Sequence, residues 1–154
     1  MPIYLQIPTI AGDSGSKALP NQNLFFLMSF AWGVTNSGNG KPIFSSLTVT
    51  KVGTFHGPSL MLAAAAGKTL GKIELFLTKD NQNANEVLAA SWTLTNASIV
   101  SYQESFSSAG GGLGSLAMSI FFTKIEYKQY TANKDGSTSM SDDHFWDIQM
   151  NKGG

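Results

Sequence analysis

Apolar and polar residues alternate along most of the chain with a period of two, and this alternation predicts β-strands. In one such segment Leu47 and Val49 share one face, and Thr48, Thr50 and Val52 share the other. Segments of this kind separated by Gly, Asn and Ser clusters are typical of antiparallel β-proteins. We therefore expect a mainly β fold, an antiparallel barrel or sandwich of about eight strands. The alternating segments are residues 2–10, 24–34, 47–52, 72–78, 87–102, 116–130 and 144–150.

One short segment departs from this period and predicts the only helix, over residues 58–66. Pro58 can occupy the first helical position because its missing N–H would have no partner there. Gly67 follows a run of good helix formers and can take the left-handed conformation that ends a helix. So short a helix is stable only when docked. The side chains that we expect to dock it are Leu60, Met61 and Ala64.

Residues 24–34 show the strongest alternation. The small, partly polar face of this predicted strand fits a wall beside an open channel, and equally the solvated outer face of a sandwich. Both interpretations stay open from the pattern alone. The bulky face holds Phe26, Met28, Phe30, Trp32 and Val34, and the small face holds Leu27, Ser29, Ala31 and Gly33.

A long loop follows that strand. Its glycines and its proline predict neither helix nor paired strand. Ile43 and Phe44 are apolar and need cover, either from their own domain or from a neighbouring subunit. Long loops in compact domains are often functional. The loop residues in question are Asn36, Ser37, Gly38, Asn39, Gly40, Lys41, Pro42, Ile43 and Phe44, with Ser45 and Ser46 leading into the next strand.

Two irregularities are expected in the second half of the chain. Residues 87–95 and 97–102 read as one long or kinked strand. In residues 116–130 the apolar positions change parity, which a β-bulge near Thr123 and Lys124 would produce. The last strand, residues 144–150, should place Trp146 and Ile148 inward.

Composition narrows the classes of function. Charged residues make up 13% of the 154 residues, the net charge is zero and every cation is lysine. A nucleic-acid binder would show a basic excess, so we expect no nucleic-acid partner. A nearly neutral surface favours association. We expect one domain, residues 1–154, without disulfides, since the chain has no cysteine.

The ends and apolar runs of the chain bear on its location. Residues 1–5 lack the basic and long apolar regions of a signal peptide. The apolar run of residues 24–28 is far too short to span a bilayer. We expect synthesis in the cytoplasm, no membrane insertion, and any export by a route that reads no N-terminal signal.

Candidate chemistry is sparse, so we expect no enzyme, no cofactor and no metal. A triad of Ser59, His56 and Asp143 lacks a nucleophile elbow. Asp142, Asp143 and His144 could bind a metal, but adjacent strand residues point to opposite faces. Residues 80–86 lack the central glycine of a calcium loop, and residues 107–115 lack the spacing of a phosphate-binding loop. Trp32, Trp92 and Trp146 lie on apolar faces, although exposed tryptophans would favour the alternative function, a carbohydrate-binding β-sandwich.

The order of four motifs resembles the haemolysin-coregulated protein (Hcp) family, the inner-tube component of type VI secretion systems. The first is the Trp-Gly strand end and Gly-rich loop of residues 29–38. The second is residues 47–51 followed by Gly57-Pro58-Ser59-Leu60-Met61 and Ala66-Gly67-Lys68. The third is the Ser/Gly-rich loop and strand of residues 102–127, and the fourth is Phe145-Trp146-Asp147-Ile148.

This resemblance implies a small β-barrel with a side helix that assembles into a homohexameric ring. It further implies that rings stack into a tube inside a contractile sheath. The implied partners are further copies of the chain, sheath, spike and baseplate proteins, and effector proteins carried in the channel. On this basis residues 36–44 are expected to contact the next ring, and Leu27, Ser29, Ala31 and Gly33 to face the channel.

Overall fold

The computed structural model describes residues 1–16, 18–19, 23–38, 40–53, 56–80, 85–108, 114–133 and 137–154. As the alternation predicts, the fold is mainly β and antiparallel, with one short helix. A ten-stranded sheet holds most strands, and β4 and β5 form a separate two-stranded ladder. The elements are β1 (Ile3–Gln6), β2 (Phe25–Leu27), β3 (Ser29–Ala31), β4 (Val34–Thr35), β5 (Ile43–Phe44), β6 (Leu47–Val52), α1 (Gly57–Ala66), β7 (Thr69–Asp80), β8 (Glu86–Ser105), β9 (Ser115–Phe121), β10 (Lys124–Ala132), β11 (Thr138–Asp147) and β12 (Lys152–Gly153).

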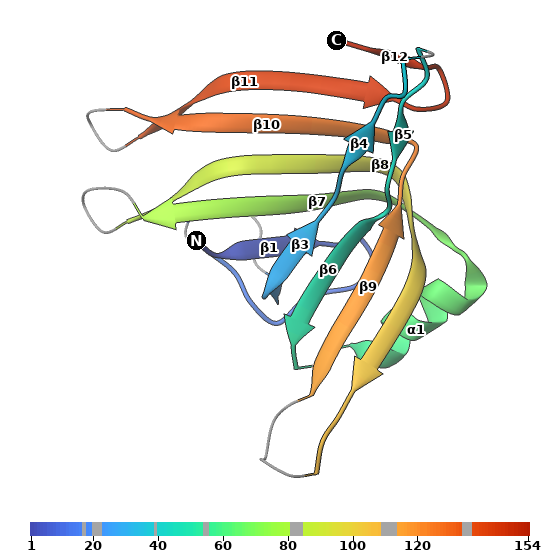
Figure 1. Ribbon diagram of the computed structural model, residues 1–154. Coiled ribbons are helices and arrows are strands. Elements are labelled where there is room, and N and C mark those ends of the chain that lie inside the picture. The colour runs from blue at the N-terminus through green and yellow to red at the C-terminus, as the bar shows by residue number, and fades with distance from the viewer. Residues whose placement is uncertain are drawn as a thin grey trace.

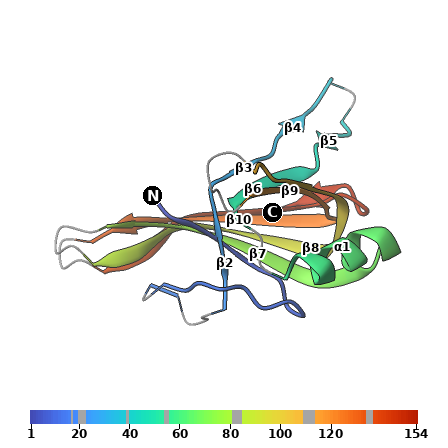
Figure 2. The same cartoon turned by 90° about the horizontal axis from the view of Figure 1, so that it is seen from below.

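The large sheet folds back over itself. Its main path runs β12-β11-β10-β8-β7-β1-β2, and a branch runs from β8 through β9 and β6 to β3. Figures 1 and 2 show β3, β6 and β9 as a second layer against β7 and β10. β2 and β3 are joined by the chain at Met28 and not by a ladder, so pairing among the described strands does not close a complete barrel. The core lies between the two layers.

β8 links the two layers because it is long and kinked, as the sequence predicts. Residues 90–95 of β8 pair with β10, and residues 98–105 pair with β9. Between these halves Asn96 has a φ of 52°, and the register with β9 shifts between Ile99 and Ser101. A kink here lets one strand belong to both layers, which is how the sheet turns its corner.

The parity change predicted near Thr123 also marks this corner. The strand ends at Phe121 and a new one begins at Lys124, so the chain makes a corner there and not a bulge within one strand. The inward faces agree with the alternation on both sides of the break. Side chains at most 4% exposed there are Leu116, Met118, Ile120, Phe122 and Ile125.

The helix begins at Gly57 and ends at Ala66, one residue longer than expected. Gly67 has a φ of 60° and donates its N–H to the carbonyls of the last turn, so the predicted C-cap is confirmed. The expected docking set is partly wrong. Leu60 is fully buried and Ala64 is half-buried against the core, but Met61 is 51% exposed and Ala63 is buried in its stead.

The predicted strand over residues 24–34 is wrong in its continuity and in the face of its first half. It consists of β2, β3 and β4, and Leu27 is only 3% exposed while Phe26 and Met28 are 47% and 60% exposed. Met28 stands between the two strands and donates its N–H to the Thr50 carbonyl at 2.8 Å. This one extra residue reverses the parity, so the predicted faces hold from Ser29 to Trp32, whereas Val34, predicted on the bulky inward face, is 51% exposed.

The C-terminal strand is longer and starts earlier than predicted. β11 covers Thr138–Asp147, and the chain then turns into β12, which pairs with the end of β11. Trp146 and Ile148 are half-buried and pack against the core, which confirms their predicted direction. The turns predicted around residues 80–86, 107–115 and 133–136 lie partly outside the described residues, although pairing of Asp80 with Glu86 confirms the first as a hairpin.

Candidate functional site

The residues considered for catalysis do not form a catalytic set. His56 and Ser59 line one groove of about 630 Å³ beside α1, together with Ile10, Leu62 and other residues. Asp143 lies on β11, which Figure 1 places at the opposite side of the molecule from α1. The three side chains considered as a triad are therefore not brought together.

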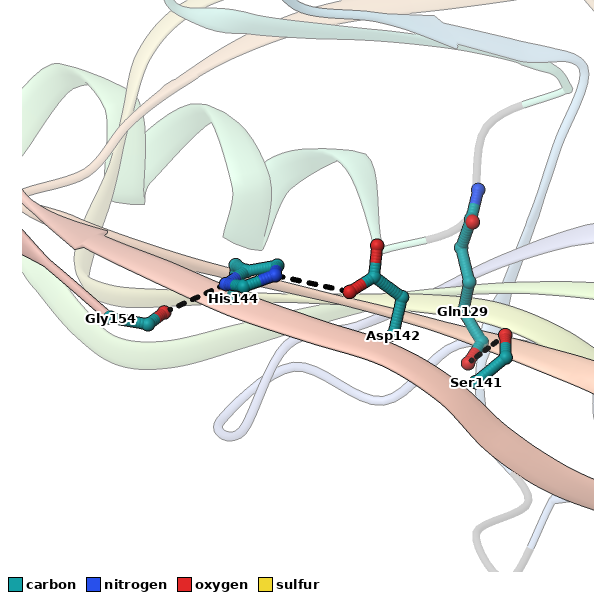
Figure 3. Close-up of polar contacts among 5 residues, drawn as sticks. All are labelled: Gln129, Ser141, Asp142, His144 and Gly154. Atoms are coloured by element: carbon teal, nitrogen blue, oxygen red, sulfur yellow. Dashed lines mark hydrogen bonds and ion pairs between the residues drawn. The ribbon is translucent and has the colours of Figure 1, made fainter.

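The Asp142, Asp143 and His144 cluster is likewise a local structural feature. His144 Nε2 lies 3.1 Å from Asp142 Oδ1, and His144 Nδ1 lies 3.2 Å from the Gly154 carbonyl oxygen, as Figure 3 shows. Ser141 donates to the Gln129 carbonyl at 3.2 Å on the same strand pair. The histidine thus ties the chain end to β11. Within the described residues no group of three His, Asp or Glu side chains could hold a metal ion.

The three tryptophans are packed into the protein. Trp92 is 5% exposed, and its ring stacks on Tyr127 with centroids 4.7 Å apart. Trp32 meets the same Tyr127 edge-on at 6.1 Å, and Trp146 packs against the core. This confirms the core-packing interpretation. A glycan-binding platform needs exposed rings, so these side chains give the carbohydrate-binding alternative no support.

The long loop of residues 36–46 is a projecting hairpin. Contrary to prediction it contains a paired strand, because Val34 and Thr35 pair with Phe44 and Ile43. We call residues 34–44 the β4–β5 hairpin. Figure 2 shows it extending away from both layers of the sheet. At its base Ser45 donates its backbone N–H and its hydroxyl to the Gly33 carbonyl, at 3.0 and 3.2 Å.

The two apolar residues of this hairpin have different environments. Phe44 is half-buried, packs against the core and meets Phe122 edge-on with ring centroids 6.1 Å apart. Ile43 is 70% exposed, and Val34, on the paired strand, is 51% exposed. Phe44 thus finds cover in its own domain, and Ile43 presents an apolar side chain to solvent. Asn39 lies outside the described residues.

Of the residues expected to face a channel, one is buried in the core and the others lie at the surface or are half-buried. Leu27 is in the core, so its assignment to a channel face is wrong, for the parity reason given above. Ser29 and Ala31 are exposed, and Gly33 is half-buried at the base of the hairpin. Register extends the Ser29–Ala31 face across β6, β9 and β8. We call this the small-residue face, and it consists of Ser29, Ala31, Thr48, Thr50, Ala117, Ser119, Ser101 and Gln103.

The small-residue face carries no charge. Hydroxyl groups pair across its strands, with Ser29 Oγ 2.6 Å from Thr50 Oγ1 and Thr48 Oγ1 3.5 Å from Ser119 Oγ. A solvated outer surface of a small domain normally carries about one charged residue in every three or four. The face is therefore uncharged and made of small or polar side chains, and the exposed Val52 and Phe121 continue it along β6 and β9.

A hollow that the sequence did not reveal lies where α1 begins. We call it the α1 hollow, and it has a volume of about 480 Å³ and is lined by Gly57, Pro58, Met61, Tyr102 and Glu104. The Tyr102 hydroxyl donates to Glu104 Oε1. Burial, the hydrogen bond and the charge of Glu104 all raise the pKa of Tyr102, so it stays protonated as a donor.

Gly57 is needed for the close approach of this pair to the helix. A Cβ on Gly57 would lie 2.7 Å from Glu104 Oε1 and 2.9 Å from the Tyr102 hydroxyl. The signal available in the sequence was the i, i+2 spacing of Tyr102 and Glu104 in a strand, which puts them on one face. What could not be read was that α1 lies against that face.

A second polar network ties the chain's first loop to the β7–β8 hairpin. Glu86 accepts hydrogen bonds from Thr78 and from Tyr4, the latter at 3.2 Å. Burial alone would raise the pKa of Glu86, but hydrogen bonds from Thr78, Ser16 and Tyr4 outweigh it and hold that pKa below its ordinary value. The network covers a small cluster in which Leu24 is fully buried. Its role is structural.

Comparison with known proteins identifies the family. The family model described as "Type VI secretion system effector, Hcp" matches residues 4–130. The chain belongs to the Hcp family. It is thus a tube subunit of a type VI secretion system, a structural protein of a secreted family. Three of the four resembling motifs lie within the matched residues, and the fourth, residues 145–148, lies beyond them.

Solved structures share the Hcp fold over nearly the whole chain. One described as a type six secretion system protein is 19% identical, with a TM-score of 0.87 and 99% of each chain covered. Hcp1 from Salmonella typhimurium is 19% identical, with a TM-score of 0.79 over 99% of this chain and 98% of that one. The secreted protein Hcp3 from Pseudomonas aeruginosa is 16% identical, with a TM-score of 0.66 over 92% and 97%. No curated protein sequence matches the chain.

Within the described residues there is no helix of the length and hydrophobicity needed to cross a bilayer. Membership of the Hcp family implies that the chain associates into oligomers. Among the described surfaces of this Hcp chain, the candidates for such association are the β4–β5 hairpin, the small-residue face and the α1 hollow.

Proposed function

We propose that this chain assembles as a single domain into homohexameric rings, that the rings stack into a tube, and that the small-residue face lines the channel. The uncharged, small-residue character of that face is the observation that carries the proposal. A sandwich exposing Ser29, Ala31 and Thr48 to bulk water has no need to exclude charge there. A channel wall does need to exclude charge, because a charged wall would hold passing proteins of opposite charge.

The β4–β5 hairpin supports the same assembly. Ile43 is 70% exposed on a projecting hairpin, and burial of its side chain against another subunit would be favourable. We propose that residues 36–44 contact the next ring. A head-to-tail contact of this kind is heterologous, and it propagates into an open filament when the subunits are arranged along one axis.

The remaining partners follow from the proposed assembly. The tube would lie within the sheath, carry the spike, and start from the baseplate of the secretion system. Effector proteins would occupy the channel, and the chain would leave the bacterial cytoplasm through the apparatus. We propose no enzymatic role, because Ser59 and His56 beside α1 are not brought together with Asp143 on β11.

Size-exclusion chromatography with light scattering tests the assembly. We expect a mass close to six times the 16.4 kDa of one chain, and ring-shaped particles by negative-stain electron microscopy. A monomeric mass that persists up to the highest soluble concentration, without rings on the grid, would overturn the proposal. Quenching of tryptophan fluorescence by glycans would instead favour the carbohydrate-binding alternative.

A further inference from the structure

The α1 hollow and the β4–β5 hairpin have complementary chemistry. Among the described residues that line the hollow, Glu104 is the only charged one, and the apolar part of the lining comes from Pro58 and Met61. Met61 is 51% exposed. On the hairpin, Lys41 is the only charged residue between residues 34 and 46, and Ile43 beside it is 70% exposed. One surface is therefore anionic and apolar, and the other is cationic and apolar.

The two surfaces lie at opposite ends of β6. β5 leads into the start of β6 at Leu47. Glu104 pairs with Leu116, which in turn pairs with Lys51 near the end of β6. Four residues of strand separate these levels by about 13 Å, and the hairpin projects further. Figure 1 shows the hairpin at one end of this layer and the end of β8 at the other.

We propose that Lys41 and Ile43 of one copy dock into the α1 hollow of a copy in the next ring, with the Lys41 ammonium on Glu104 and Ile43 against Met61. Because the two partners lie at opposite ends of one protomer, each copy offers both, and the contact repeats along the stack without closing. The inference rests on the proposed stacking of rings, and it specifies which residues make the contact between neighbouring rings.

The geometry of the hollow suits a lysine side chain. A carboxylate that accepts one hydrogen bond from Tyr102 still has further lone pairs for an ammonium. The butyl stem of lysine can lie along Pro58 and Met61 while its charged end reaches Glu104, which is how long cationic side chains usually cover apolar surface.

Charge reversal tests the contact. Lys41→Glu and Glu104→Lys should each raise the protein concentration needed for tubes at least tenfold, and the double variant should restore it to within about threefold, as expected for a directly coupled pair. Both single variants should keep the mass of the intact ring. Tubes that form unchanged in either single variant, a double variant no better than the single ones, or a loss of ring mass would overturn the inference.

Disulfide trapping gives an independent test, because the chain has no cysteine. A copy carrying Ile43→Cys, mixed with a copy carrying Met61→Cys, should give a disulfide-linked pair that contains one of each. The control replaces Met61→Cys by Met140→Cys, which is 54% exposed on β11. Equal trapping of both pairs in preparations that show stacked rings would refute the docking and leave the tube function standing. Absence of rings from the unaltered chain would refute the proposed function itself.

Discussion

Ile43 and Phe44 are adjacent on one short strand, and we predict opposite consequences for replacing them. Phe44→Ala should weaken the fold, and Ile43→Asp should weaken assembly. Replacing a fully buried phenylalanine by alanine costs about 3–5 kcal/mol. Phe44 is half-buried, so we expect about 2 kcal/mol, which includes about 0.5–1.5 kcal/mol for its edge contact with Phe122.

The corresponding figures for Ile43 point the other way. Its side chain is 70% exposed. Full burial of an isoleucine contributes about 1.5–3 kcal/mol, so the buried third contributes under about 1 kcal/mol to the fold. The exposed part would contribute about 1–2 kcal/mol per copy if a neighbouring subunit covered it. An aspartate there adds the cost of desolvating a carboxylate, and the contact recurs in every copy.

The assay must separate folding from association, since association shifts the apparent stability. We would compare Ile43→Asp with the double variant that also carries Phe44→Ala, at one protein concentration, by thermal unfolding followed by circular dichroism. For a domain of this size about 2 kcal/mol corresponds to a melting temperature lower by roughly 4–8 °C. Tube formation by Ile43→Asp would be followed by electron microscopy.

Three results would refute this reasoning. A drop of less than about 2 °C on adding Phe44→Ala would mean that the hairpin is not seated on Phe122. A melting temperature for Ile43→Asp that lies roughly 4–8 °C below that of Lys41→Glu, which should be equally deficient in tubes, would give Ile43 a role within its own subunit. Tubes that Ile43→Asp forms normally would exclude the exposed side chain from ring-to-ring contact.

Three other predictions concern the fold and the channel wall. Leu60→Ala should lower the free energy of unfolding by about 2–5 kcal/mol because Leu60 is fully buried. Gly67→Ala should lower it by about 1–2 kcal/mol because φ is 60° there. Denaturant unfolding would measure both, and equal losses of unfolding free energy would contradict the burial of Leu60 or the backbone conformation of Gly67. Hydrogen bonds lower the pKa of Glu86, so its contribution to stability is present above its unfolded pKa of about 4.3 and is lost as pH falls through the folded pKa. Unfolding midpoints measured down to about pH 3 should therefore fall less steeply for Glu86→Gln than for the unaltered chain. Parallel curves for the two proteins would contradict this. Ala31→Leu should change the free energy of unfolding by less than about 0.5 kcal/mol and Leu27→Ala by about 2–5 kcal/mol, and a reversed order would move Ala31 into the core.

Local sequence pattern determined much of this protein. Alternation at a period of two located the long strands and the inward positions Leu47 and Val49, because in a strand successive side chains point to opposite faces whatever the fold. The helix and its end at Gly67 followed from residue types alone, since only glycine takes a positive φ at no steric cost. The kink in β8 and the corner near Thr123 were also visible as breaks in periodicity.

Tertiary structure decided which residues face inward on either side of each break in the alternation. One extra residue at Met28 reversed the faces of β2, and it is held there by a hydrogen bond to Thr50 from a distant strand. The α1 hollow exists because Gly57 meets Tyr102 and Glu104, which belong to a strand far along the chain. Periodicity reports only which side chains share a face. Whether that face packs against another element or meets solvent depends on long-range strand pairing, which no local sequence pattern encodes.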